Sequence, residues 1–188
     1  MRAATPVPAD LLAERRRLGH DKFDEMWEGE LHMVPPAKEE HQRISGRLFA
    51  AWLDAAEESG LHLRFEIGLF DPAIPEPTSY RQPDLAVFSD AVRTERGIDG
   101  AAHLVVEIRS PGDESFQKLP FYERMGVGEV LIIDRDTKAV RRWALTDGDL
   151  VETQPDRDGW HHLAAIPVAL RTDAGVLVVR TPDGTTRI

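Results

Sequence analysis

Apolar residues between positions 38 and 59 recur at the spacing of a helix. Ile44, Leu48 and Trp52 follow one another at four-residue steps, which places them on one face. His41 stands three residues before Ile44 and therefore shares this inward face. The pattern predicts a helix over residues 38–59 that buries one face in a core.

After Gly60 the pattern changes to an alternation of apolar and polar residues, which is typical of half-buried strands. We expect strands over residues 61–70, 82–88, 103–108 and 130–134. The last of these is almost entirely apolar, which indicates burial on both faces. A further helix is expected from the turn at residues 110–113 to about Met125, with Gly126 in the left-handed position that ends it.

The two ends of the chain carry weaker signals. Residues 9–27 are charged and are expected to be helical in pieces, and residues 30–34 read as a short strand that Pro35 stops. The last third alternates strand-like segments with Asp-Gly turns, and we expect strands over residues 140–145, 150–153, 161–166 and 176–179. This predicts an N-terminal helical arm over residues 1–19 and a single domain of mixed α/β (α+β) class over residues 20–188.

Charge and composition narrow the function classes. The chain has 188 residues, with 23 Lys and Arg against 33 Asp and Glu, so its net charge is −10. Neither half is basic, which argues against an unspecific coat for nucleic acid, because such binding depends on Lys and Arg meeting phosphates. The absence of Cys excludes disulfides, thiol catalysis and Cys-bound metal centres. No apolar run suits a membrane span or a signal peptide, so we expect a cytoplasmic protein without a membrane partner.

Glu107 is the first candidate for chemistry, because it lies within an apolar segment, residues 104–108, that should be a buried strand. A buried carboxylate costs several kcal/mol unless a partner or a metal compensates it. Arg109 lies two residues further on, on the same strand face, and would form a structural ion pair with Glu107. The residues alone favour neither the ion pair nor a functional carboxylate.

Asp84 follows Pro83 and opens another apolar strand. Two carboxylates that enter one core from different strands repel each other unless a cation lies between them, and hard oxygen ligands favour Mg²⁺ or Mn²⁺. A turn-capping aspartate is the alternative for Asp84. Glu30, at a strand start, and His41, on the inward helix face, complete the candidate group, and a hydrogen-bonded core histidine is the alternative for His41.

Lys118 and Tyr122 are four residues apart in the second predicted helix, so their side chains share one face. We consider them as members of the same candidate site. The alternative is a lysine that faces solvent and a tyrosine that belongs to the core.

The order of these motifs along the chain resembles a known family. The motifs are Glu-Gly-Glu-Leu with Pro-Pro and His (28–41), Pro-Asp (83–84), Leu-Val-Val-Glu-Ile-Arg-Ser-Pro (104–111), Lys and Tyr (118–122) and Gly-Val-Gly-Glu-Val-Leu-Ile-Ile-Asp (126–134). In this order the chain resembles the Uma-two family of restriction-endonuclease-like proteins, within the PD-(D/E)XK nuclease superfamily. The resemblance covers residues 20–170, approximately.

The resemblance implies a restriction-endonuclease-like fold, with a mixed central sheet flanked by helices and a β-rich C-terminal part. It also implies that Asp84 and Glu107 are the metal-binding acid pair and that Glu30 is the acidic position before them. The superfamily's usual lysine, two residues after the second acid, is replaced here by Arg109, a departure shared by much of the family. Lys118 matches a family lysine and would then be the displaced catalytic lysine.

The leading hypothesis is a bacterial metal-dependent endonuclease that acts on DNA, with Mg²⁺ or Mn²⁺ held by Asp84, Glu107 and Glu30. Lys118 would orient the attacking water or stabilise charge, and its amine can lose a proton where burial and the metal lower its pKa. The guanidinium of Arg109 cannot act as a base. The rival hypothesis is a non-catalytic or regulatory protein-interaction module that retains the fold, which suits the net charge of −10. A third is a simple homodimer in which Glu107 and Arg109 form a structural ion pair.

Overall fold

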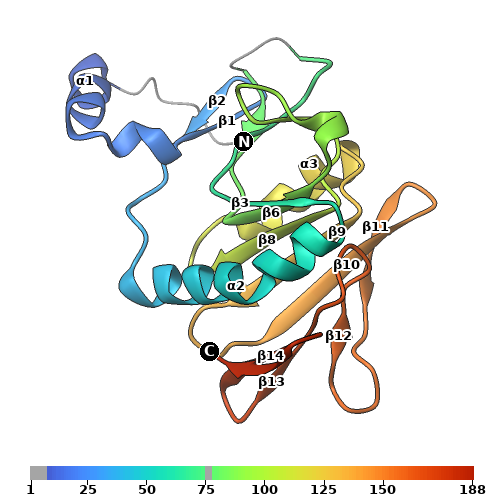
Figure 1. The fold of residues 1–188 in the computed structure, drawn as a ribbon. Helices are drawn as coiled ribbons and strands as arrows, with labels where there is room; N and C mark the ends of the chain where they lie inside the picture. The colour runs from blue at the N-terminus through green and yellow to red at the C-terminus, as the bar shows by residue number, and fades with distance from the viewer. Residues whose placement is uncertain (1–7, 75–77) are drawn as a thin grey trace.

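A six-stranded mixed sheet forms the centre of the protein (Figure 1). The computed structural model describes residues 8–74 and 78–188. The strand order is β11-β10-β9-β8-β6-β3, with bounds β3 His62–Phe65, β6 Leu85–Phe88, β8 Leu104–Arg109, β9 Glu129–Asp134, β10 Val140–Thr146 and β11 Asp149–Thr153. Only β8 and β9 run parallel in this sheet, and a helical crossover joins them, as parallel strands require. The expected mixed central sheet is confirmed.

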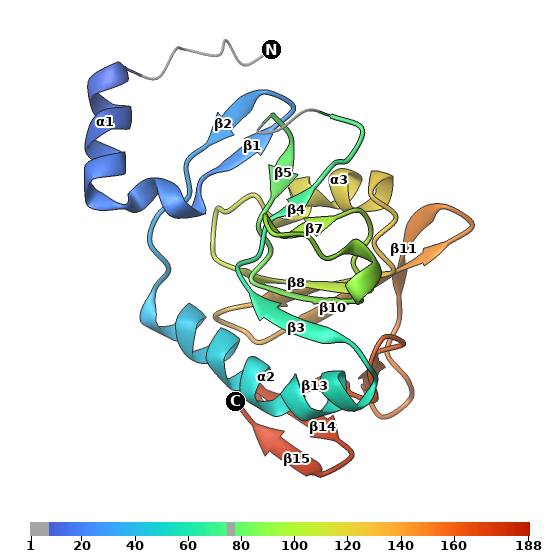
Figure 2. The same cartoon turned by 45° about the horizontal axis from the view of Figure 1, so that its top comes forward.

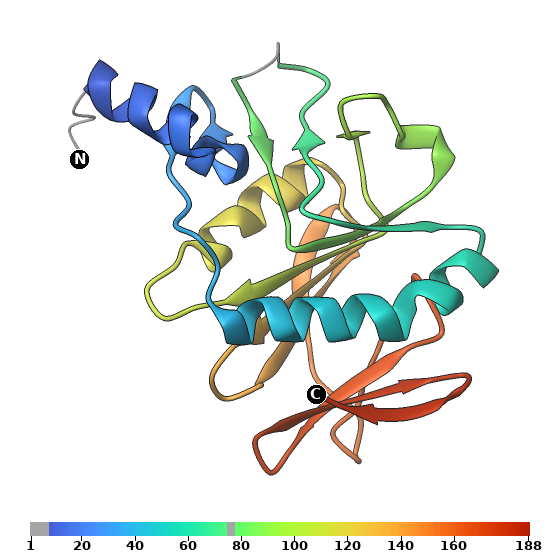
Figure 3. The same ribbon diagram turned by 60° about the vertical axis from the view of Figure 1, so that its left-hand side comes forward.

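Helix α2 (Glu39–Glu58) packs against one face of this sheet. Ile44, Leu48 and Trp52 are fully buried, so the face predicted from their four-residue spacing is confirmed. The C-terminal sheet covers the other side of the helix (Figure 3), and its strands are β12 His161–His162, β13 Ala169–Asp173, β14 Val176–Thr181 and β15 Gly184–Arg187. One apolar core joins all three layers, because Leu170 and Val179 pack into the same cluster as α2.

Helix α3 (Leu119–Arg124) lies on the opposite face of the central sheet and follows a 3-10 turn at Ser115–Lys118. Because side chains alternate along a strand, Val106 faces the cluster around α2 while Val105 faces the cluster around α3. The same alternation turns Glu107 toward α3. The helix ends at Arg124, and Gly126, just beyond its C-cap Met125, has a φ of +72°, which matches the left-handed position expected for it.

A third sheet lies on the α3 side of the molecule (Figure 2). Its order is β2-β1-β5-β4-β7, with bounds β1 Glu25–Trp27, β2 Glu30–His32, β4 Leu69–Phe70, β5 Tyr80–Arg81 and β7 Ile98–Asp99. Glu28 and Gly29 connect β1 and β2, both at positive φ, as a tight two-residue hairpin turn requires. Two more 3-10 turns occupy His20–Phe23 and Asp90–Val92. No described helix is long and apolar enough to cross a membrane.

Several predicted elements differ from the observed ones. Residues 9–27, expected to be helical in pieces, form α1 (Ala9–Leu18) and the 3-10 turn His20–Phe23, which Gly19 separates in a left-handed conformation, but their last residues form the strand β1. The single strand expected over residues 61–70 is divided into β3 and β4, since Glu66 between them has a φ of +44°. The strand expected over residues 161–166 is only two residues long, and β13 and β15 were not predicted. Residues 1–7 of the expected arm lie outside the described residues.

Candidate active site

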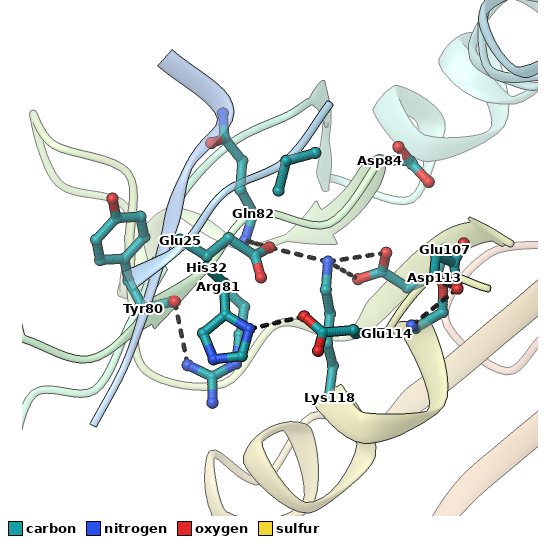
Figure 4. A network of polar contacts seen from close by, with 12 residues as sticks. Glu25, His32, Tyr80, Arg81, Gln82, Asp84, Glu107, Asp113, Glu114 and Lys118 are labelled. Carbon is teal, nitrogen blue, oxygen red and sulfur yellow. Dashed lines mark hydrogen bonds and ion pairs between the residues drawn. The ribbon is translucent and has the colours of Figure 1, made fainter. Parts of the chain in front are cut away.

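A cavity of about 610 Å³ opens where β1, the start of α2 and the ends of β6 and β8 meet. Four of the residues singled out from the sequence line it: His41, Asp84, Glu107 and Lys118. They come from four separate elements, and the fold alone brings them together. Figure 4 shows the polar contacts at this place, with Lys118 between two carboxylates.

Glu107 lies at the buried wall of the cavity and is only 4% exposed. The Lys118 Nζ lies 3.1 Å from both of its carboxylate oxygens, and the Tyr122 hydroxyl donates to Oε1 at 2.5 Å. The predicted shared face of Lys118 and Tyr122 is therefore confirmed, and the solvent-facing lysine is not what the structure has. Burial raises the pKa of Glu107 to about 8, and the nearby charges of Asp84 and Glu25 act in the same direction.

Glu25 is a member of this cluster that the sequence analysis missed. It is 1% exposed and accepts hydrogen bonds from Trp27 Nε1 at 2.7 Å, from the Gln82 backbone N–H at 2.7 Å and from Lys118 at 2.9 Å. Residues 9–27 were expected to be helical, which hid the short strand β1. The signal that could have shown it is the Glu28-Gly29 pair, which can close a two-residue hairpin turn.

Glu30 does not line the cavity. It pairs with Trp27 beside the hairpin turn, at the end of the hairpin away from the Glu25–His32 pair, and is exposed. The expectation that Glu30 completes the acidic group is therefore corrected, because Glu25 is the hairpin carboxylate that reaches Lys118.

Asp84 and His41 form the second half of the site. Asp84 Oδ1 lies 2.7 Å from His41 Nε2, and Oδ2 accepts a hydrogen bond of 2.6 Å from the backbone N–H of Ile108. Asp84 stands directly before β6, so its carboxylate reaches the neighbouring strand β8 one residue after Glu107. Burial alone would lower the pKa of His41, but the charge of Asp84, with smaller contributions from Glu107 and Glu66, raises it.

The pKa of the Lys118 amine is set by two opposing effects. Burial alone would lower the pKa of its amine, but Glu107 and Glu25 outweigh burial and raise the pKa above its usual range. These two carboxylates therefore favour the protonated form of the lysine. The loss of a proton expected from the sequence depends on a bound metal and stays a prediction.

Arg109 has a structural partner other than Glu107. Its Nη1 donates to Asp134 Oδ2 at 2.9 Å, on the neighbouring strand β9. The guanidinium also lies over the ring of Phe116, 5.4 Å from its centre. The structural Glu107–Arg109 ion pair considered from the sequence is wrong, because Glu107 has Lys118 and Tyr122 as its partners.

The donor set of the cavity can be compared with what a cation requires. Among residues 8–74 and 78–188, no three His, Asp or Glu side chains are gathered so as to hold a metal ion on their own. Asp84 and Glu107 nevertheless offer two carboxylates on one cavity. Mg²⁺ is commonly held by one or two carboxylates with water and substrate phosphate as its other ligands. The residues present therefore fit Mg²⁺ or Mn²⁺ better than a metal that needs a complete protein cage.

Residues 12–175 match the family Uma2, described as “Putative restriction endonuclease”, and the chain belongs to this family. The chain is also similar to a crystal structure from Anabaena variabilis ATCC 29413, described as “a putative nuclease belonging to DUF820”. Sequence identity is 18%, the match covers 71% of this chain and 78% of that one, and the TM-score is 0.56, which supports the fold. No curated protein matches the chain.

Proposed function

We propose that this protein hydrolyses phosphodiester bonds of DNA with a divalent cation, Mg²⁺ or Mn²⁺, at Asp84 and Glu107. The observation that carries the proposal is the convergence of Asp84, Glu107 and Lys118 on one cavity from three separate elements. Membership of a family described as “Putative restriction endonuclease” supports the same chemistry.

The charges of the cluster favour a cation. Glu25, Asp84 and Glu107 are three carboxylates, and Lys118 is the only lysine that contacts any of them among the described residues. Burial is the main cause of the raised pKa of Glu107, and the charges of Asp84 and Glu25 add to it. A cation held by Asp84 and Glu107 would polarise the scissile phosphate and lower the pKa of a bound water.

In this proposal each side chain of the site has a different role. Lys118 donates to a phosphoryl oxygen, where its charge stabilises the transition state. Glu25 holds the Lys118 amine in place, and His41 fixes the orientation of Asp84. Glu30 has no task at this site, since it does not line the cavity.

A non-catalytic module that keeps the fold is the second candidate. It is favoured by two observations, the net charge of −10 and the ion pairs of Lys118, which already occupy Glu25 and Glu107. Such a protein would bind a partner without cleaving nucleic acid.

The test is cleavage of plasmid and of labelled oligonucleotides in Mg²⁺, in Mn²⁺ and in EDTA. We expect cleavage by wild type only with the cation, and its loss in Glu107→Gln. The matched control Glu152→Gln changes a carboxylate on β11 that pairs with Arg141 away from the cavity, and it should cleave like wild type. Mn²⁺ binding without any cleavage, on single-stranded and duplex DNA and RNA alike, would overturn the nuclease and leave the non-catalytic module.

A further inference from the structure

A second, shallower groove of about 520 Å³ adjoins the candidate active site. Glu66 and Gln82 line both the groove and the active-site cavity, so the two hollows share a wall. The other lining residues are Arg64, Phe65, Ile67, Gly68, Phe70, Tyr80 and Arg96. Three aromatic rings and two guanidinium groups thus lie directly beside a cavity that is dominated by carboxylates.

The aromatic floor of the groove is held in place by its surroundings. The rings of Phe70 and Tyr80 lie 5.3 Å apart, and the Tyr80 hydroxyl donates to the backbone oxygen of Asp24 at 2.8 Å. A Cβ at position 68 would lie 2.6 Å from Cε2 of Phe70, so only glycine leaves room for this ring. The guanidinium of Arg96 lies 4.7 Å from the centre of the Phe70 ring. Arg96 is also paired with Asp99, at 2.6 Å from Nη2 to Oδ1. The floor is therefore a fixed stacking surface beside an ion pair.

The rim of the groove carries groups that are open to a ligand. Phe65 is 40% exposed, and its ring stacks on Phe49 at 4.2 Å, which holds it upright. Arg64 is exposed and forms no ion pair with any of the described residues, since its one hydrogen bond goes to the backbone oxygen of Leu63.

The wall between the two hollows is tied to the candidate metal ligands. The backbone N–H of Glu66 donates to the backbone oxygen of Asp84 at 3.2 Å, and the side chain of Gln82 donates to the backbone oxygen of Glu66. Glu66 takes a left-handed φ of +44°, a conformation that costs a glutamate free energy and is retained only when its surroundings enforce it. A chain that passes over this wall would move directly from Asp84 into the groove.

We propose that the groove binds the single-stranded part of a nucleic acid whose neighbouring phosphodiester lies in the active-site cavity. This inference rests on the proposed function and names its substrate class. The bases of a duplex are stacked on each other and show only their edges, which proteins read with a protruding helix or ribbon. A hollow lined by rings accepts instead the faces of unstacked bases, while Arg64 attracts a phosphate.

The experiment measures binding of a fluorescein-labelled oligothymidylate by anisotropy, in EDTA so that no cleavage occurs. Removing one stacking ring is expected to weaken such binding by about fivefold or more, because stacking contributes about 1–3 kcal/mol per base. Phe65→Ala and Arg64→Ser should each show this loss, while a blunt duplex of equal length should bind equally to both variants and to wild type. Val151→Ala, at a half-exposed apolar residue on β11, and Arg187→Ser, at an exposed arginine on β15, are the matched controls.

The outcomes separate this inference from the proposed function. If Phe65→Ala and Arg64→Ser bind oligothymidylate like wild type while wild type cleaves DNA with Mg²⁺, the groove proposal fails and the nuclease stands. If both variants lose single-strand binding while wild type cleaves nothing, the groove stands and the nuclease fails. Equal losses in the Val151→Ala and Arg187→Ser controls, or on the duplex, would also overturn the groove. Matched melting temperatures of all variants confirm that each one is folded.

Discussion

Glu107 shows what a buried carboxylate costs when no metal is bound. Its folded-state pKa of about 8 lies above that of an unfolded glutamate, so the native state binds more protons between these values. Stability that is present at low pH is therefore lost as the pH rises toward 8. If Glu107 holds a cation, as we propose, the cation takes the place of that proton.

We therefore predict two effects of Glu107→Gln. In EDTA at pH 8 the variant should be more stable than wild type by about 1 kcal/mol, because a neutral amide replaces a buried charge of similar shape. In calorimetry it should not bind Mn²⁺. Mn²⁺ affinity equal to that of wild type would exclude Glu107 as a ligand, and Glu152→Gln should change neither quantity.

Lys118 carries the opposite charge of the same cluster. Lys118→Ala leaves Glu25 and Glu107 buried without their shared cation, so we expect a loss of about 3–5 kcal/mol in the free energy of unfolding. Adding Glu25→Gln removes one of the two carboxylates left without the lysine, and it should restore part of the lost stability. Urea unfolding of the two single variants and the double variant measures this coupling. If the loss in the double variant equals the sum of the losses in the two single variants, the Lys118–Glu25 contact does not contribute to stability.

At the scale of elements, α2 depends on one apolar face. Trp52 is fully buried between the central and C-terminal sheets, so Trp52→Ala should lower the free energy of unfolding by about 3–5 kcal/mol. Leu11→Ala on α1, a helix without buried residues, should change it by less than about 0.5 kcal/mol. Urea unfolding measures the free energy of unfolding of both variants. If Trp52→Ala loses as little stability as Leu11→Ala, the packing of α2 described above is contradicted.

An ion pair joins the first turn of α2 to the loop between β9 and β10. Glu40 accepts hydrogen bonds from Arg43 and from Lys138, and these hold its pKa near a value of about 2. Because the folded pKa is lower than the unfolded one, the contribution is present above about pH 4.5 and is lost as the pH falls toward about 2. Glu40→Gln should cost about 0.5–1 kcal/mol at pH 7, a small value because the site is partly exposed to solvent.

Urea unfolding at several pH values tests this dependence. The free energies of unfolding of wild type and Glu40→Gln should become more similar below pH 4, which is about half a unit under the usual glutamate pKa. A difference that stays constant from pH 7 to pH 3 would show that the ion pairs are not its source.

The elements that could be predicted from the sequence are those whose apolar residues recur at a regular spacing or form an unbroken run. The spacing of Ile44, Leu48 and Trp52 predicted α2, and the apolar runs predicted β8 and β9. The strands of the third sheet are two or three residues long and have no period to detect. The division between β3 and β4 depends on one left-handed glutamate, Glu66, which no propensity would place there.

The same distinction applies to the candidate site. Asp84, Glu107 and His41 were detected because each is a polar residue at a place where its element should be buried. Glu25 was missed, because its environment is created by distant partners, Gln82 and Lys118, which only the fold brings near. Arg109 was paired with the wrong carboxylate for the same reason, since Asp134 lies 25 residues away on β9.

At the scale of the whole molecule, a net charge of −10 must be reconciled with a nucleic acid substrate. Long-range attraction is weak for such a protein, so affinity has to come from a few local contacts. The groove and the active site together are lined by five cations, and two of them, Arg96 and Arg135, are paired with Asp99 and Asp136. The three that we assign to phosphates are Lys38, Arg64 and Lys118. Binding of single strands should therefore depend on salt only moderately.

The number of phosphate contacts predicts how strongly salt weakens binding of a single strand. Three neutralised phosphates on a single strand correspond to a slope of about −2 in a plot of log affinity against log salt concentration, and Arg64→Ser should reduce that slope by about 0.7. Anisotropy titrations of labelled oligothymidylate at several KCl concentrations in EDTA measure both values. A slope near zero would mean that no phosphate is contacted. A slope twice as steep as expected would require a basic surface elsewhere, which the distribution of charge along this chain does not favour, because neither half of it is basic.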